Sequence, residues 1–112
     1  MSDKRRCFGE IRICGINYRL FVISELEWAE LNQTKHIITF GVDSIVSRAW
    51  FEYLLFHEVC HIIEDIAGLE VTDGQISTLS RVMMAFLRDN GLLKKSQVRK
   101  LWRDARKQSK EC

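Results

Sequence analysis

The sequence predicts an α+β fold in one small domain, and three observations support this prediction. Apolar and polar residues alternate in the first forty residues, as they do in β-strands with one buried face. From residue 48 onward, apolar residues recur at helical spacing in segments that end at glycines. The chain has 112 residues, of which 46% are hydrophobic, which is enough for one modest core and too little for two.

Three strands are expected in the N-terminal part. Residues 10–24 have the sequence EIRICGINYRLFVIS, in which two alternating segments flank a Gly-Ile-Asn turn and predict a β-hairpin. Residues 36–40 (HIITF) are apolar and rich in β-branched side chains, which predicts a third strand. The polar residues 25–33 predict only a helical turn or a loop. We therefore expect a small antiparallel sheet of about three strands.

Three helices are expected in the rest of the chain. Residues 48–67 contain no Gly or Pro and are apolar around most of the helix, which predicts a central helix that ends at Gly68. Residues 72–75 (TDGQ) form a capping box, and the amphipathic helix that follows ends near Gly91. A basic helix is predicted at residues 96–110. These elements predict a domain at residues 1–93 and a basic helical tail at residues 94–112.

Composition argues against export and against membrane insertion. No apolar segment approaches the roughly 20 residues that a membrane helix needs, and no apolar segment follows the basic N-terminus as in a secretory signal. The four cysteines include no CxxC pair, so they indicate free thiols in a reducing compartment. We expect a cytoplasmic protein with no membrane partner.

The charge of the chain is unevenly distributed. The net charge is +2, yet residues 94–112 contain eight basic residues and only two acidic ones. Such a tail leaves contact with nucleic acid or with an acidic protein open, although a solvated helix is the commoner structure.

The most informative feature is the sequence HEVCH at residues 57–61. His57 and His61 are four residues apart, so a helix places both imidazoles on one face, where they can bind one metal ion at about 2.0–2.1 Å. Glu58 reaches the same cleft and can act as a general base. The motif predicts a zinc site that hydrolyses peptide bonds. The alternative is a structural pair of histidines.

The order of elements, together with the segments LLFHEVCHII and LRDNG, resembles the small HExxH metallopeptidase-like proteins of phages and mobile elements, which are relatives of the ImmA/IrrE-type minimal zincins. The resemblance covers roughly residues 10–91. It implies a minimal zincin-like fold, in which the sheet packs on the HExxH helix and on a second amphipathic helix. It also implies that His57 and His61 bind one zinc ion, that Glu58 is the general base, and that a third, acidic ligand comes from early in the second helix.

The third ligand is where the chain departs from that pattern. Gln75 occupies the place of the expected glutamate, and its neutral amide is a poor zinc ligand. Gln75 can instead complete a capping box with Thr72. Asp73 and Glu70 are the anionic alternatives, although the helix dipole alone also favours a carboxylate at Asp73.

Two functions therefore stay open at the level of sequence. The first is a zinc peptidase that acts on a peptide or protein substrate. The second is a catalytically weak or inactive zincin-fold module that binds a protein or nucleic-acid partner.

Two further expectations concern the surroundings of the motif. The aromatic residues just before it have helical spacing and are expected in the core rather than in a substrate pocket; they are Trp50, Phe51, Tyr53 and Phe56. By analogy with zincin sites, an extended peptide substrate would pair with residues 35–40, which we expect to form the edge strand of the sheet.

Overall fold

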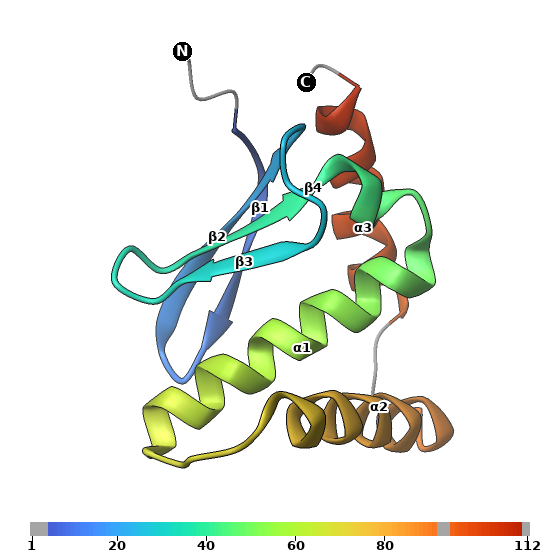
Figure 1. Cartoon of the computed structure of the whole chain (residues 1–112). Coiled ribbons are helices and arrows are strands. Elements are labelled where there is room, and N and C mark those ends of the chain that lie inside the picture. The colour runs from blue at the N-terminus through green and yellow to red at the C-terminus, as the bar shows by residue number, and fades with distance from the viewer. Residues whose placement is uncertain (1–4, 92–94, 111–112) are drawn as a thin grey trace.

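The computed structural model describes residues 5–91 and 95–110 and confirms an α+β fold, with one four-stranded mixed sheet and three α-helices (Figure 1). The strands are β1 (Arg6–Ile13), β2 (Ile16–Ile23), β3 (Ala29–Asn32) and β4 (Ile37–Gly41). A short 3-10 helix, η1 (Val42–Ile45), precedes the helices α1 (Arg48–Ala67), α2 (Asp73–Asp89) and α3 (Lys95–Ser109). None of the helices in these ranges is long and apolar enough to cross a membrane.

The sheet has the strand order β1-β2-β4-β3 and is mixed, so the prediction of an antiparallel sheet of about three strands was wrong. The β1-β2 hairpin was predicted correctly, but its turn is at Cys14 and Gly15, which have positive φ angles, and not at Gly-Ile-Asn, because Ile16 and Asn17 belong to β2. After β2 the chain forms a second hairpin, β3-β4, and β4 inserts between β2 and β3. Because β4 is the second arm of that hairpin, it runs parallel to β2.

The edge strand next to α1 is β3, which the sequence did not predict. Residues 25–33 were expected to form a helical turn or loop, but Ala29–Asn32 pairs with β4. Glu30 and Asn32 are exposed on this strand, and such polarity, common on edge strands, hides the strand pattern. The expectation that residues 35–40 form the edge was also wrong, since all five residues of β4 are buried between two neighbours.

The hydrophobic core lies between the sheet and the helices α1 and α3. Alternate residues of β2 and β4, such as Leu20 and Phe40, are fully buried and pack with Phe51 of α1. Ala105 of α3 belongs to the same core and is 0% exposed. The segment predicted as a basic tail therefore contains a helix whose apolar side completes the core.

Local sequence signals set both ends of α1, which contains the HEVCH motif, and the start of α2. The side chain of Ser47 accepts a hydrogen bond from the backbone N–H of Trp50 at the start of α1. Gly68 ends this helix in the left-handed conformation, at φ 69°. The predicted capping box opens α2, which packs across α1 through Ile76 and Met84.

Gly41, at the end of β4, allows two segments of backbone to touch. Its N–H donates a hydrogen bond to the carbonyl of Trp28 at 2.8 Å. A Cβ atom at this position would lie 1.6 Å from the carbonyl oxygen of Leu26. Only glycine permits this approach, which holds the loop before β3 beside α1.

Candidate metal centre

The helix α1 brings the imidazoles of His57 and His61 together, as their spacing predicts. The two Nε2 atoms face each other at 3.2 Å. Two nitrogens bonded to one tetrahedral zinc ion at about 2.05 Å lie about 3.3 Å apart. The separation fits two ligands of one zinc ion, and it also fits an N–H···N hydrogen bond between the two rings, which is the structural alternative.

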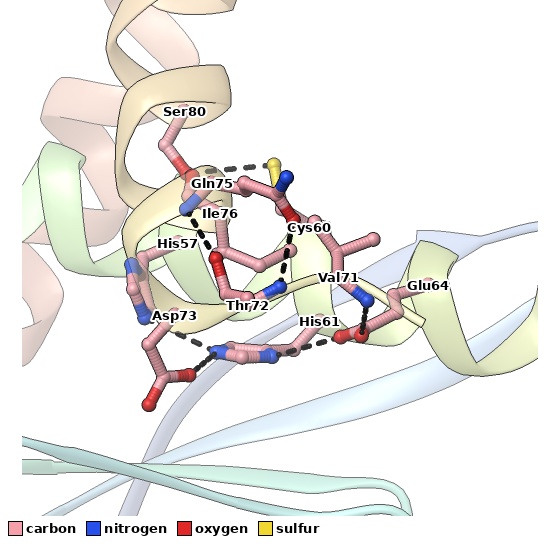
Figure 2. A network of polar contacts seen from close by, with 10 residues as sticks. All are labelled: His57, Cys60, His61, Glu64, Val71, Thr72, Asp73, Gln75, Ile76 and Ser80. Carbon is pink, nitrogen blue, oxygen red and sulfur yellow. Dashed lines mark hydrogen bonds and ion pairs between the residues drawn. The ribbon is translucent and has the colours of Figure 1, made fainter. Parts of the chain in front are cut away.

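Glu64 orients His61, and the sequence analysis did not identify it. Its Oε1 lies 3.3 Å from Nδ1 of His61, and its Oε2 accepts a hydrogen bond from the N–H of Val71 at 2.9 Å (Figure 2). With the ring proton on Nδ1, the Nε2 lone pair of His61 points toward His57. Carboxylates support metal-binding histidines in this way. The three-residue spacing of His61 and Glu64 on one helix was the available signal.

His57 occupies a drier position than His61. Burial lowers the pKa of His57, the nearby His61 lowers it further, and Asp73 opposes both effects. The imidazole is therefore neutral at neutral pH, which is the form that binds metal. Its Nδ1 is buried without a hydrogen-bond partner in the described part of the chain.

Asp73, not Gln75, lies next to the histidines. Its Oδ1 is 3.7 Å from Nε2 of His61, and its side chain is 93% exposed and so free to reorient. The side chain of Gln75 instead accepts a hydrogen bond from the N–H of Thr72 at 2.9 Å, which completes the capping box (Figure 2). Glu70 is exposed on the loop before α2.

The two imidazoles fit a zinc ion, whereas the third ligand is incomplete. Within residues 5–91 and 95–110, no three His, Cys, Asp or Glu side chains are grouped closely enough to hold a metal ion. Two imidazoles face each other at this place, and one carboxylate of α2 lies at their margin.

The contacts between α1 and α2 show which side chains of α2 lie near the histidines. Asp73 lies beside His61, and two turns further along α2 the guanidinium of Arg81 lies 5.4 Å from the ring centre of Tyr53. Helical spacing places Ser77 midway between Asp73 and Arg81 on this side of α2. Ser77 therefore offers a hydroxyl group, and no carboxylate, at the position of α2 between these two contacts.

Glu58 is buried next to the histidines and is 8% exposed. Burial raises the pKa of Glu58 to about 7, a shift that His61 opposes and Asp73 reinforces. At this pKa the carboxyl group can both accept and donate a proton near neutral pH.

Two hollows meet at Glu58, and each borders one histidine and the edge strand β3. The hollow beside His61 has a volume of about 490 Å³ and is lined by Leu31, Gln33, Glu58, His61, Glu64, Asp65 and Leu69. The hollow beside His57 has a volume of about 250 Å³ and is lined by Trp28, Ala29, Trp50, Tyr53, Leu54, His57 and Glu58.

The aromatic residues before the motif divide between core and hollow. Phe51 is fully buried in the core, as predicted. Trp50 and Tyr53 are half-buried, and their stacked rings line the smaller hollow while they also pack against the core. Their packing against the core is as expected, and the sequence did not indicate that they also line a hollow.

Comparisons with protein-family models, with curated proteins and with solved structures found no match to this chain.

Proposed function

We propose that this protein is a zinc-dependent peptidase of the minimal zincin type that works in the cytoplasm. His57 and His61 hold the metal, and Asp73 is the nearest candidate for the third ligand. The observation that carries the proposal is the 3.2 Å separation of the two Nε2 atoms on α1. The free thiols of Cys7, Cys14 and Cys60 suit a reducing compartment.

The side chains around the metal position have complementary tasks. When bound, zinc supplies Lewis-acid chemistry, which acidifies water and polarises a carbonyl group. Glu58 removes the proton from the attacking water as the new C–O bond forms, and it passes that proton to the amine as the C–N bond breaks. A pKa of about 7 suits both transfers.

An extended peptide can reach these groups along β3. This strand forms one edge of the sheet, so its outer N–H and C=O groups can pair with a peptide backbone. The hollows on either side of Glu58 would then accept side chains on the two sides of the scissile bond.

The first experiment measures zinc content by elemental analysis of protein purified without chelator. We expect about one zinc per chain in the wild type and none in a His57→Ala, His61→Ala double variant. Absence of zinc from the wild type would contradict the proposal.

The second experiment measures the hydrolysis of fluorescein-labelled casein. Glu58→Gln should retain zinc and the fold but lose at least about a hundredfold in rate, because general-base catalysis contributes 10²–10⁴-fold. Asp65→Asn is the matched control, since Asp65 lines the same hollow and has no assigned role. Unchanged hydrolysis by the Glu58→Gln variant would remove Glu58 from the mechanism.

The absence of three grouped metal-binding side chains among residues 5–91 and 95–110 favours a second candidate, a zincin-fold interaction module without activity. In that case the wild type loses zinc on dialysis, whereas Ser77→Asp, which adds a carboxylate at the intermediate position of α2, retains zinc. Retention of zinc by the wild type, together with hydrolysis, would exclude this alternative.

A further inference from the structure

The start of α1 and one side of α3 border a hollow that the peptidase proposal does not use. The hollow has a volume of about 450 Å³ and is lined by Arg48, Arg99, Trp102 and Arg103; we call it the arginine hollow. Figure 1 shows α3 beside the first turns of α1, far from the end of α1 that approaches the start of α2. Three of its four lining residues are arginines, and none of the four is acidic.

The positive charge of the arginine hollow is not neutralised within the described part of the chain. The buried Glu52 lies 3.5 Å from Nε of Arg48, but it also accepts a hydrogen bond from Arg88 at 3.0 Å. One carboxylate is thus shared between two arginines. Arg99 and Arg103 have no ion-pair partner among residues 5–91 and 95–110. The excess charge favours an anionic ligand.

The position of Arg48 points to the same kind of ligand. It is the first residue of α1, and the first turn of this helix has no acidic residue. The positive end of the helix dipole disfavours a cation at this position and favours an anion. A phosphate in the hollow would interact favourably with the helix end and with the guanidinium groups, whose forked donors match phosphate oxygens.

The positive charge continues along α3 as a row of exposed residues, Arg99, Arg103 and Arg106, followed by Lys110 directly after the end of the helix; we call these four residues the basic stripe. Their spacing places them on one side of the helix and its last turn, and eleven steps of 1.5 Å cover about 16 Å. A row of this length suits a linear polyanion better than a small anion.

Trp102 favours single-stranded nucleic acid among the linear polyanions. Its Nε1 donates a hydrogen bond to the carbonyl of Ile45 at 2.8 Å, which holds the half-buried ring in place. The guanidinium of Arg106 lies 5.4 Å from its ring centre. Proteins that bind single strands combine basic grooves with fixed aromatic rings on which bases stack.

We propose that the arginine hollow and the basic stripe bind single-stranded nucleic acid through its phosphates, and that Trp102 presents an aromatic surface to a base. This function is independent of the metal centre. It can therefore fail or succeed separately from the peptidase proposal.

Fluorescence anisotropy with a labelled 15-nucleotide oligothymidylate tests the proposal. The protein is used with EDTA, so that metal cannot contribute, between 25 and 200 mM NaCl, conditions we choose because phosphate binding is salt-dependent. Five phosphate contacts, one for each basic residue of the hollow and the stripe, predict a slope of about −3.5 in log affinity against log salt, since each contact on a single strand contributes about −0.7. The double variant Arg99→Gln, Arg103→Gln should reduce the slope to about −2.1 and weaken binding about tenfold at low salt.

The matched control removes the same charge from the same helix. Lys100 and Lys107 are exposed on α3 but lie outside the basic stripe, so Lys100→Gln, Lys107→Gln should change the affinity less than about threefold. All four substituted positions are exposed, and unchanged melting temperatures will verify the fold of both variants.

Three other results would overturn the proposal. Equal losses in the two double variants would mean that only the general charge of the helix attracts the strand. Tighter binding of a duplex of the same length would exclude the single-strand assignment. Displacement of the oligonucleotide by equimolar polyglutamate would indicate an acidic protein partner instead.

Discussion

At the scale of single residues, the metal centre combines local and distant contributions. The two imidazoles meet because they are four positions apart on one helix. The carboxylates of Glu58 and Glu64 come from the same helix, whereas that of Asp73 depends on where α2 packs. Asp73 and Gln75 are both on the first turn of α2, yet one lies beside His61 and the other caps the helix.

Substitutions of Asp73 and Gln75 can distinguish a role in metal binding from a role in capping α2. Asp73→Asn should lower zinc affinity by at least about tenfold, measured by isothermal titration, because it removes the anionic oxygen beside His61. Gln75→Ala should leave zinc affinity unchanged and lower the free energy of unfolding by up to about 1 kcal/mol, because one capping hydrogen bond is lost. The opposite pattern would make Gln75 the ligand.

At the scale of elements, the candidate site depends on the edge strand β3, which the local sequence pattern does not predict. The strand β3 borders both hollows. The close backbone contact between Gly41 and Leu26 holds the loop that leads into β3. That loop also brings Trp28 to Trp50, with ring centres 5.7 Å apart. The position of β3 is therefore linked to the contact at one glycine.

The substitution Gly41→Ala tests this link. A methyl group would overlap the carbonyl of Leu26, so we expect a loss of about 2–4 kcal/mol in the free energy of unfolding, measured by urea denaturation. Tryptophan fluorescence should also change as Trp28 moves from Trp50. At Gly74, where a Cβ would meet only Thr72 Oγ1 at 3.9 Å, alanine should be neutral or stabilising. Equal costs at the two glycines would show that the backbone contact at Gly41 has no energetic importance.

At the scale of the whole molecule, the sheet, α1 and α3 share one core, and the candidate metal centre is at its border with α2. Glu58 is therefore buried, and the burial of its ionised carboxylate lowers the free energy of unfolding. Its pKa is about 7 in the folded protein and 4.5 when unfolded. Between these values the folded state binds more protons than the unfolded state, so the free energy of unfolding falls as pH rises.

The stability of metal-free protein should show this dependence. We expect Glu58 to account for a fall of at most about 3 kcal/mol between pH 4.5 and pH 8, measured by urea denaturation at several pH values. Below pH 6.5, the ionisation of His57 makes the free energy of unfolding rise as pH rises, because burial lowers the pKa of His57. The Glu58→Gln variant keeps that contribution and isolates the effect of Glu58. Identical pH profiles for the two proteins would show that Glu58 ionises without cost.

The sequence by itself determined the features that depend on neighbours along the chain. The β1-β2 hairpin, the helix that contains HEVCH, its end at Gly68 and the capping box at Thr72 follow from turn residues, caps and the helical period. The facing imidazoles of His57 and His61 follow from the same period.

Only the tertiary structure decided the features that join distant segments. Packing decides that β4 pairs in parallel with β2 and that β3 lies at the edge of the sheet. It also decides that Asp73, and not Gln75, lies beside His61. The arginine hollow likewise joins Arg48 to Arg99 and Arg103, some fifty residues further along the chain. Such contacts form because burying one shared core fixes how the elements lie against one another, and the local pattern of each element does not contain that information.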